Sequence, residues 1–390
     1  IAEAYWACGG AILLVATGLF PVNQAAHAVS EGLNVYLFLA GMMILAEIAQ
    51  EERVFDWAAG VAASHAKGST RRLFALVYGV GIVVTALLSN DATAVVLTPA
   101  VLAVVRRARV EPKPYLLACA LIANAASFVF PISNPANLVV FGSQMPPLRQ
   151  WLGTFLLPSA GAIVTTYLCL HWLVHKQLAQ PIEQTVDPAR LSNEGRLALA
   201  GLLGAALALI ASSAFGLPLG IPTCAAALLV LVVLSARNRT LPGSVTRGVS
   251  WSILPLVAGL FVIVEAMQKA GMLQAGLAGM RFLATVPQWA AKTVPAFAAA
   301  LASNGMNNLP VALISRAAIR DGHEPGILAH AILLGVDLGP NLSVTGSLAT
   351  ILWLIALRRE NVEITAGEFF RIGLVVMPLS LLASLFLLRS

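Results

Sequence analysis

Long apolar segments separated by short polar loops dominate the pattern of the chain. These segments cover approximately residues 5–22, 34–49, 73–105 with a polar break, 114–141, 151–174, 197–215, 219–236, 251–267, 294–319 with a polar break, 327–357 and 367–388. A helix needs about 20 mainly apolar residues to cross a bilayer, and most of these segments reach or approach that length. The pattern therefore predicts an all-α polytopic membrane protein.

The composition narrows the class of protein further. Of the 390 residues, 58% are hydrophobic and 11% are charged. Soluble domains carry about 25% charged residues, so a soluble enzyme, a secreted disulfide scaffold and a disordered regulator are excluded. The cysteines form no C-x-x-C pair, and the sequence has no G-x4-GK[ST] loop. We therefore expect no disulfide framework, no metal site, no cofactor and no ATP hydrolysis by the chain itself.

A repeat divides the chain at its longest polar stretch, residues 175–196. On either side, three pairs of segments match in the same order, 213 to 218 residues apart. The pairs are LAGMMILAE (39–47) with VAGLFVIVE (257–265), LLSNDATAVVLTP (87–99) with LASNGMNNLPVAL (301–313), and FPISNPANLV (130–139) with SVTGSLATIL (343–352). The pattern predicts a first repeat over 1–174, a cytoplasmic linker over 175–196 and a second repeat over 197–390.

The polar breaks decide how the two repeats are oriented. The tip Ser89-Asn90-Asp91 separates arms at 73–88 and 92–105, both too short to span, so we expect a re-entrant hairpin, and a second hairpin at 294–319. If both hairpins return to the face they left, one face carries 17 of the 24 Lys and Arg residues, in loops 50–72, 106–113, 175–196, 237–250 and 358–371. The positive-inside rule makes that face cytoplasmic, and it explains the net charge of +6 without a nucleic-acid partner.

This assignment predicts two inverted-topology repeats, each with about five transmembrane helices, a re-entrant hairpin and a broken helix. The first repeat shows no counterpart of segment 197–215, so we expect one further helix to precede Ile1. Inverted repeats with polar breaks in corresponding positions are typical of secondary transporters, whose substrate site lies near the bilayer midplane.

Amides and hydroxyls dominate the breaks. Neither hairpin tip nor helix break contains Lys or Arg, which argues against a polyanionic substrate. Asn, Ser and Thr both donate and accept hydrogen bonds, as a small neutral polyol-like cargo requires. The candidate substrate-binding residues are Ser89, Asn90, Asn134, Asn137, Ser303, Asn304, Asn307, Asn308, Asn341 and Thr345.

Acidic residues at membrane depth are the candidates for proton coupling. An ionisable side chain in the bilayer is unfavourable and by default marks a functional site, so we expect Asp91 and Asp337 to carry protons. The structural alternative is an acid that only caps a half-helix. Glu47 and Glu265 recur at matching positions, but they end apolar segments, where an acid at headgroup level is common, and are weaker candidates.

Four strings in the sequence resemble a known family: SNDATAVVLTP, MNNLP (306–310), DLGP (337–340) and GSLATILWL (346–354). They are similar to the arsenite efflux permeases, or arsenical pump membrane proteins, of the ion transporter superfamily, which also contains dicarboxylate and citrate carriers. The resemblance covers the whole chain. It departs from the family at Ser343-Val344-Thr345, where Thr-Pro-Ile is usual, and at Asn124, where an acid is frequent.

The resemblance implies a multi-pass protein of the cell inner membrane. It implies export of arsenite and antimonite, as neutral As(OH)3 and Sb(OH)3, coupled to inward proton movement, with optional association with a cytoplasmic ATPase subunit. Three hydroxyls on a neutral molecule suit the amide-rich breaks. Two alternatives stay open: a sodium/proton or organic-anion exchanger of the same superfamily, and an intramembrane aspartyl protease that uses Asp91 and Asp337.

Overall fold

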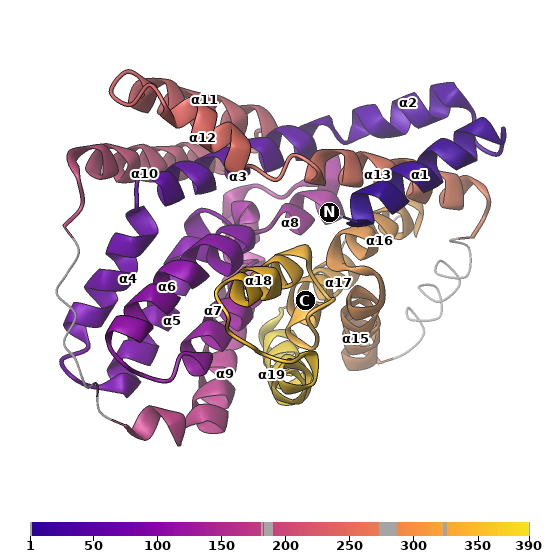
Figure 1. The fold of residues 1–390 in the computed structure, drawn as a ribbon. Coiled ribbons are helices and arrows are strands. Elements are labelled where there is room, and N and C mark those ends of the chain that lie inside the picture. The colour runs from indigo at the N-terminus through magenta and orange to yellow at the C-terminus, as the bar shows by residue number, and fades with distance from the viewer. Residues whose placement is uncertain (1, 181, 183–189, 273–286, 323–325, 390) are drawn as a thin grey trace.

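The computed structural model describes residues 2–180, 182, 190–272, 287–322 and 326–389. Within these ranges the chain is helical and contains no strand, which confirms the all-α prediction (Figure 1). The α-helices are α1 (Ala2–Ala16), α2 (Val22–Glu31), α3 (Leu33–Glu51), α4 (Val54–His65), α5 (Thr70–Leu87), α6 (Thr98–Arg107), α7 (Lys113–Ala125), α8 (Pro135–Phe141), α9 (Leu148–Val174), α10 (Asn193–Ala214), α11 (Gly220–Ser235), α12 (Leu241–Gly248), α13 (Ile253–Lys269), α15 (Gln288–Met306), α16 (Asn308–Gly322), α17 (Ile327–Leu338), α18 (Leu348–Arg359) and α19 (Ala366–Leu387).

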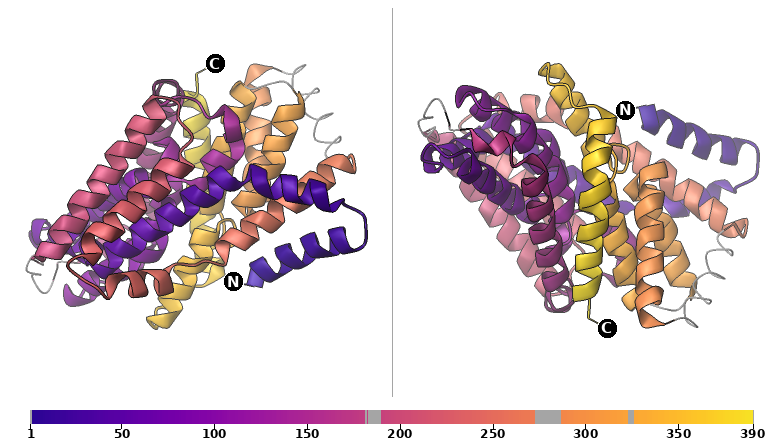
Figure 2. Two further views of the ribbon diagram at one scale, coloured as in Figure 1. Left: turned by 90° about the horizontal axis from the view of Figure 1, so that it is seen from above. Right: turned by 90° about the horizontal axis from the view of Figure 1, so that it is seen from below.

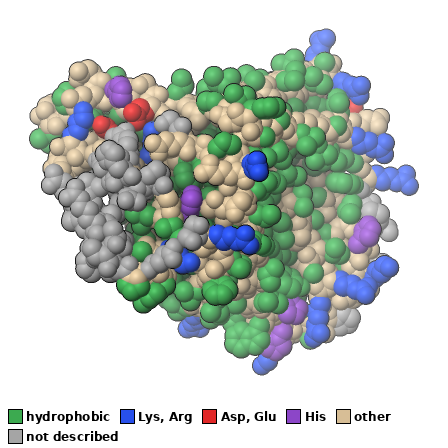
Figure 3. All heavy atoms as spheres, turned by 180° about the vertical axis from the view of Figure 1, so that it is seen from behind, with side chains coloured by type: hydrophobic (Ala, Val, Ile, Leu, Met, Phe, Trp, Pro, Cys, Tyr) green, Lys and Arg blue, Asp and Glu red, His purple; other side chains and the backbone are tan. Residues whose placement is uncertain are grey.

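Helices long and apolar enough to cross a membrane make up much of this set. Six such stretches are found in the described residues: Leu33–Glu51, Thr70–Leu87, Leu148–Val174, Asn193–Ala214, Leu241–Lys269 and Ala366–Leu387. Large apolar side chains such as Leu207, Leu229 and Phe386 are exposed on the surface. Figure 3 shows a broad band of hydrophobic side chains, with Lys and Arg projecting along the right-hand edge. Such a surface fits a lipid environment and confirms the prediction of a membrane protein.

Small residues let the long helices pack closely. Helix α3 packs on α11, and α13 packs on α1. A Cβ atom added at Gly41 of α3 would lie 2.7 Å from the carbonyl carbon of Thr223 in α11. One added at Gly259 of α13 would lie 2.8 Å from the carbonyl carbon of Ala7 in α1. Membrane helices associate through such close backbone contacts. Helix α19 packs between α9 and α15 (Figures 1 and 2).

Both predicted hairpins are interrupted at their polar tips. Helix α5 ends at Leu87, and a π-helix, η1 (Ala92–Leu97), continues into α6. Helix α15 ends at Met306, and Asn307 adopts a left-handed φ of 74° before α16 begins. The first arm is longer than predicted, because Ser69 accepts a hydrogen bond from the amide of Arg72 and caps α5 at Thr70.

Two helices are broken where the sequence predicts it. Helices α7 and α8 are separated by an irregular stretch that contains the 3-10 turn η2 (Pro131–Ser133). Helices α17 and α18 are separated by a stretch that contains the 3-10 turn η5 (Gly339–Asn341). The other 3-10 turns are η3 (Gly142–Gln144) and η4 (Gln177–Ala179).

Two regions predicted as polar loops are partly helical. Loop 50–72 contains α4, and loop 237–250 contains α12. Each helix buries apolar residues, Val54 and Phe55 in α4 and Leu241 and Val245 in α12. Helix α12 is polar on its other face, whereas α4 is largely apolar but too short to span a bilayer.

The predicted linker at 175–196 is described only in part. Residues 181 and 183–189 lie outside the described residues. At its start, the Thr70 hydroxyl donates to the carbonyl of Leu178. At its end, Ser192 accepts a hydrogen bond from the amide of Gly195 and caps α10. The division of the chain into two repeats on either side of this linker stays a prediction.

Candidate functional site

The two broken helices contact each other through side-chain amides. Asn134, at the start of α8, donates from Nδ2 to Oδ1 of Asp337 at 2.8 Å, and Asp337 is fully buried. The side-chain oxygen of Asn134, Oδ1, also accepts a hydrogen bond from the backbone amide of Ala136 at 3.0 Å, so the same residue caps α8. Oδ2 of Asp337 is buried without a hydrogen-bond partner among the described residues.

A second contact lies beside the first. Asn124 Nδ2 donates to Asn341 Oδ1 at 2.9 Å, and Asn341 Nδ2 donates to the carbonyl of Leu121 at 3.1 Å. Asn137 donates to the carbonyl of Ser127 at 2.9 Å. Together, Asn124, Asn134, Asn137, Asp337 and Asn341 form a buried polar group between the two halves, called here the central contact.

A second group lies where α15 meets the break between α17 and α18. Asn304 Nδ2 donates to the carbonyl of Gly339 at 2.9 Å, and its Oδ1 accepts from the Ser343 hydroxyl at 2.6 Å. The Thr345 hydroxyl donates to the backbone carbonyl of Asn304 at 2.9 Å. These contacts tie the tip of the second hairpin to the broken helix of its own half. We call Ser303, Asn304, Asn307, Asn308, Ser343 and Thr345 the second-tip cluster.

The remaining tip residues of the second hairpin bond within their own hairpin or are buried. Ser303 donates to the carbonyl of Ala299 at 2.9 Å, within the last turns of α15. Asn307 Oδ1 accepts from the amide of Leu309 at 3.3 Å, and Asn308 is buried. With φ 74° and ψ 155°, Asn307 lies outside the left-handed helical region, in backbone space that non-glycine residues rarely occupy.

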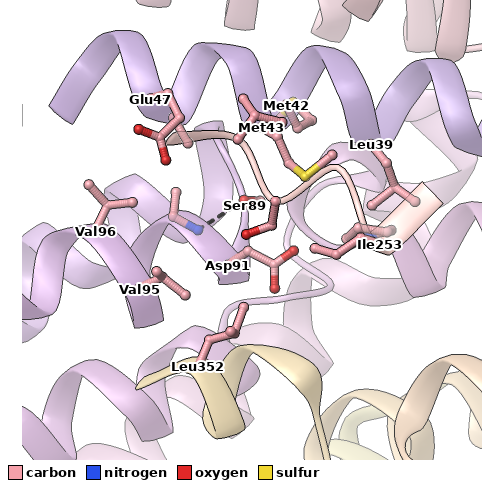
Figure 4. A pocket seen from close by; sticks show the side chains of 15 residues that line it. Leu39, Met42, Met43, Glu47, Ser89, Asp91, Val95, Val96, Ile253 and Leu352 are labelled. Carbon is pink, nitrogen blue, oxygen red and sulfur yellow. Dashed lines mark hydrogen bonds between the residues drawn. The ribbon is translucent and has the colours of Figure 1, made fainter. Parts of the chain in front are cut away.

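The first hairpin tip opens into a pocket. Ser89 and Asp91 line it, and its cavity volume is about 60 Å³, several times the roughly 10–15 Å³ that holds one water molecule. Ser89 Oγ accepts from the amide of Ala92 at 3.1 Å, and Asn90 Oδ1 accepts from the amide of Asp91 at 3.0 Å. These bonds hold the tip while the Asp91 carboxyl faces the cavity (Figure 4). We call this cavity the first-tip pocket.

The walls of the first-tip pocket come from several elements. Among the described lining residues none is Lys or Arg, and two are acidic. The second acid, Glu47, projects from α3 on the Val96 side of the pocket, whereas the Asp91 carboxyl points toward the side of Ile253 and Leu352 (Figure 4). The full lining is Leu39, Met42, Met43, Ala46, Glu47, Ser89, Asp91, Ala92, Val95, Val96, Pro135, Val249, Ser250, Ile253 and Leu352.

A smaller cleft lies at the second hairpin. Its volume is about 30 Å³, and Glu265 and Arg316 are among the residues that line it. The Arg316 guanidinium lies 3.5 Å from the carboxylate of Glu31 and 6.0 Å from the ring centroid of Phe261. We call this the second-half cleft; it carries a base, Arg316, beside the acids Glu31 and Glu265, whereas the described lining of the first-tip pocket carries acids alone.

The predicted site residues therefore fall into three groups. Ser89, Asn90 and Asp91 lie at the first-tip pocket. Asn134, Asn137, Asp337 and Asn341 belong to the central contact. Ser303, Asn304, Asn307, Asn308 and Thr345 belong to the second-tip cluster. Glu47, a weaker candidate from the sequence, also lines the first-tip pocket, and its recurrence as Glu265 is the sequence signal for it.

Comparisons with known proteins agree with this picture. Residues 1–335 match the family described as citrate transporter. The arsenical pump membrane protein of Escherichia coli K12 is 28% identical over 383 residues, covering 94% of this chain and 88% of that protein. The protein of the same name from Yersinia enterocolitica is 28% identical over 356 residues, covering 88% and 83%. An uncharacterized transporter of Mycobacterium tuberculosis is 26% identical over 400 residues, covering 96% and 90%.

A solved structure shares the fold. The crystal structure of the Alcanivorax borkumensis YdaH transporter, described as having an unusual topology, matches with a TM-score of 0.63 at 16% identity. The match covers 93% of this chain and 86% of that one. The resemblance to arsenical pump membrane proteins and to the wider ion transporter superfamily is confirmed. The chain belongs to the citrate transporter family and is a multi-pass transporter of the inner membrane.

Proposed function

We propose that the chain exports arsenite and antimonite from the cytoplasm as neutral hydroxides, coupled to inward proton movement. The observation that carries this proposal is the first-tip pocket, which holds two carboxyl groups and, among its described lining residues, no base. Its volume of about 60 Å³ suits a molecule the size of a few waters, such as As(OH)3. Similarity to proteins named arsenical pump membrane proteins supports the same cargo.

Carriage of an organic anion is the second candidate, and the family description favours it. The chemistry of the pocket opposes it. A citrate or dicarboxylate would enter a cavity lined by Glu47 and Asp91, where like charges repel. Arg316 in the second-half cleft lies beside Glu31, so its charge is already balanced in part.

Proton coupling is assigned to Asp91 first and to Asp337 second. Asp91 faces a cavity that can admit water, so its carboxyl can exchange a proton there. Asp337 accepts a hydrogen bond from Asn134 across the two halves. A proton on Asp337 weakens its acceptor strength, so its titration would change how the broken helices hold each other.

An intramembrane protease would require paired carboxyl groups. Two catalytic aspartates share one proton at a separation of about 3 Å. Here Asp337 bonds to Asn134 in the central contact, whereas Asp91 lines the first-tip pocket. This arrangement favours transport.

Two inverted repeats would supply the alternating access. Gly41 and Gly259 lie 218 residues apart, at matching positions of two similar segments. At Gly41, helix α3 of the first half packs closely on α11 of the second half; at Gly259, helix α13 of the second half packs closely on α1 of the first half. This reciprocal packing supports an internal pseudo-two-fold relation between 1–174 and 197–390. Rocking or elevator motion of one half against the other would then expose the site to each side in turn. Association with a cytoplasmic ATPase subunit is proposed as optional, from the family resemblance alone.

Uptake into everted membrane vesicles distinguishes the two cargo classes. With an imposed proton gradient, we expect radiolabelled or mass-detected arsenite to accumulate, and excess citrate to leave the rate unchanged. Vesicles from cells that lack the protein are the control. Citrate uptake, or inhibition of arsenite uptake by citrate, would transfer the assignment to organic-anion exchange.

A further inference from the structure

We propose that Glu47 carries protons between Asp91 and the cytoplasm. This role rests on the proposed function and adds a second proton-carrying residue to it. The first observation is the shared cavity: Glu47 and Asp91 are the two titratable residues in the described lining of the first-tip pocket. They come from different elements, α3 and the first hairpin tip, so the pocket brings together acids 44 positions apart in the sequence.

The second observation is the space made for the Glu47 carboxylate. A Cβ atom at Gly248 would overlap Glu47 Oε2, and it would lie 2.6 Å from Glu47 Cδ. The last residue of α12 is therefore a glycine at the point where the carboxylate passes it. Glu47 is half-buried, and any side chain at position 248 would displace its carboxylate from its present position.

The third observation is the side of the membrane on which Glu47 lies. Helix α12 and the end of α3 adjoin the loops that carry Arg53, Arg239 and Arg247, and basic loops mark the cytoplasmic face. Glu47 is one turn from Glu51 at the end of α3. It therefore stands between Asp91 and cytoplasmic water.

Glu51, one turn along α3, interacts electrostatically with Glu47 but does not line the first-tip pocket. It lines a second cavity, together with Glu52, Arg53, Asp56, Arg107 and Arg190. Arg247 of α12 turns back and donates from Nε to the carbonyl of Gly243 at 2.9 Å. Glu194 of α10 faces Glu52. The other elements lining the pocket contribute uncharged side chains, including Pro135, Ile253 and Leu352.

The proposed relay moves one proton from Asp91 to the cytoplasm in two steps. In the state open to the cytoplasm, protonated Asp91 passes its proton, through water in the pocket, to the Glu47 carboxylate. Glu47 then releases it to the cytoplasm, and both groups end as carboxylates. The counterpart Glu265 lines the second-half cleft together with Arg316, a base that has no equivalent in the lining of the first-tip pocket.

The test separates net transport from exchange in reconstituted proteoliposomes. Net proton-driven arsenite transport needs proton release, whereas arsenite–arsenite exchange at equal pH does not. We expect Glu47→Gln to lower net transport by about tenfold or more, with exchange retained within about twofold. The matched control, Glu111→Gln, removes an exposed acid of the basic loop before α7 and should behave like the wild type.

Each outcome decides the assignment. Wild-type net transport in Glu47→Gln, or loss of net transport and exchange together, overturns the relay role. If Glu47→Gln is not recovered from the membrane, Glu47→Asp decides: a displaced pH profile of net transport is expected, and an unchanged profile overturns the inference. Failure of the wild-type protein to transport arsenite would instead overturn the proposed function.

Discussion

Asn134 and Asp337 are joined by a hydrogen bond of 2.8 Å between residues 203 positions apart, and both are buried. The amide donates to Oδ1 of the carboxyl group, and its own oxygen caps helix α8. One side chain thus fixes the start of a half-helix in the first half and binds an acid in the second. Any motion between the halves must preserve or break this bond.

Replacing Asn134 tests how much this bond stabilises the fold. Asn134→Ala leaves a buried acid without its donor and removes a cap, so we expect a loss of about 1–3 kcal/mol in unfolding free energy. The measurement is denaturant or thermal unfolding of the detergent-purified protein. In an Asp337→Asn background the same substitution should cost less, because no buried carboxyl group is left without its donor. Equal losses in both backgrounds would contradict the bond's role.

Close helix packing predicts a matched pair of glycine effects. Gly41→Ala and Gly259→Ala each place a methyl group against a neighbouring backbone, so each should destabilise by about 1–3 kcal/mol. Gly204→Ala is the control, because open space surrounds that position in α10. There alanine should stabilise the helix by about 0.5–1 kcal/mol. Similar midpoints of thermal unfolding for all three variants would contradict the packing account.

The second-tip cluster predicts a binding effect at Thr345. Thr345→Val keeps the shape of the side chain but removes the hydroxyl that donates to the Asn304 carbonyl. Loss of a bond worth about 1 kcal/mol should raise the half-saturating arsenite concentration by about fivefold. Thr246→Val is the matched control, since that hydroxyl bonds only within α12 and the side chain is exposed. An unchanged half-saturation in Thr345→Val would remove the cluster from the site.

The contact between Arg316 and Glu31 predicts a charge-swap effect. Arg316→Glu places two acids together beside Phe261 and should lower both stability and transport. The double variant Glu31→Arg with Arg316→Glu should recover part of the loss, with a coupling of about 0.5–1 kcal/mol for this partly exposed pair. Unfolding of the single and double variants measures the coupling. No recovery in the double variant would show that the pairing of these two charges is unimportant.

Much of the fold was predictable because its signals are local. Apolar runs gave the spanning helices, and the breaks around Asn90, Asn134 and Asn341 were visible as polar residues inside those runs. Helices α4 and α12 were missed because each is short and buries only one face. Helix α12 has the composition of a polar loop, whereas α4 is apolar but lies between the charged positions Arg53 and Lys67. Helices this short are not stable alone, so packing against neighbouring helices decides both.

The candidate site was less predictable, because its contacts join distant segments. The pairing of Asn134 with Asp337 depends on how the two broken helices cross. From the sequence, Glu47 is a weaker candidate because it ends an apolar run, where an acid at headgroup level is common. Glu47 lines a pocket with Asp91 only because helix α12, at Gly248, and the first hairpin tip both pack close to it. These contacts join segments far apart in the sequence, so no local sequence pattern predicts them.

The most direct test of the central claim is arsenite accumulation in everted vesicles with and without a proton gradient, for the wild type and for Asp91→Asn. The account predicts that wild-type vesicles accumulate arsenite, that an uncoupler abolishes accumulation, and that Asp91→Asn, present at equal amounts in the membrane, does not accumulate it. Accumulation that persists in Asp91→Asn, or that is insensitive to the uncoupler in the wild type, would contradict proton-coupled export through the first-tip pocket.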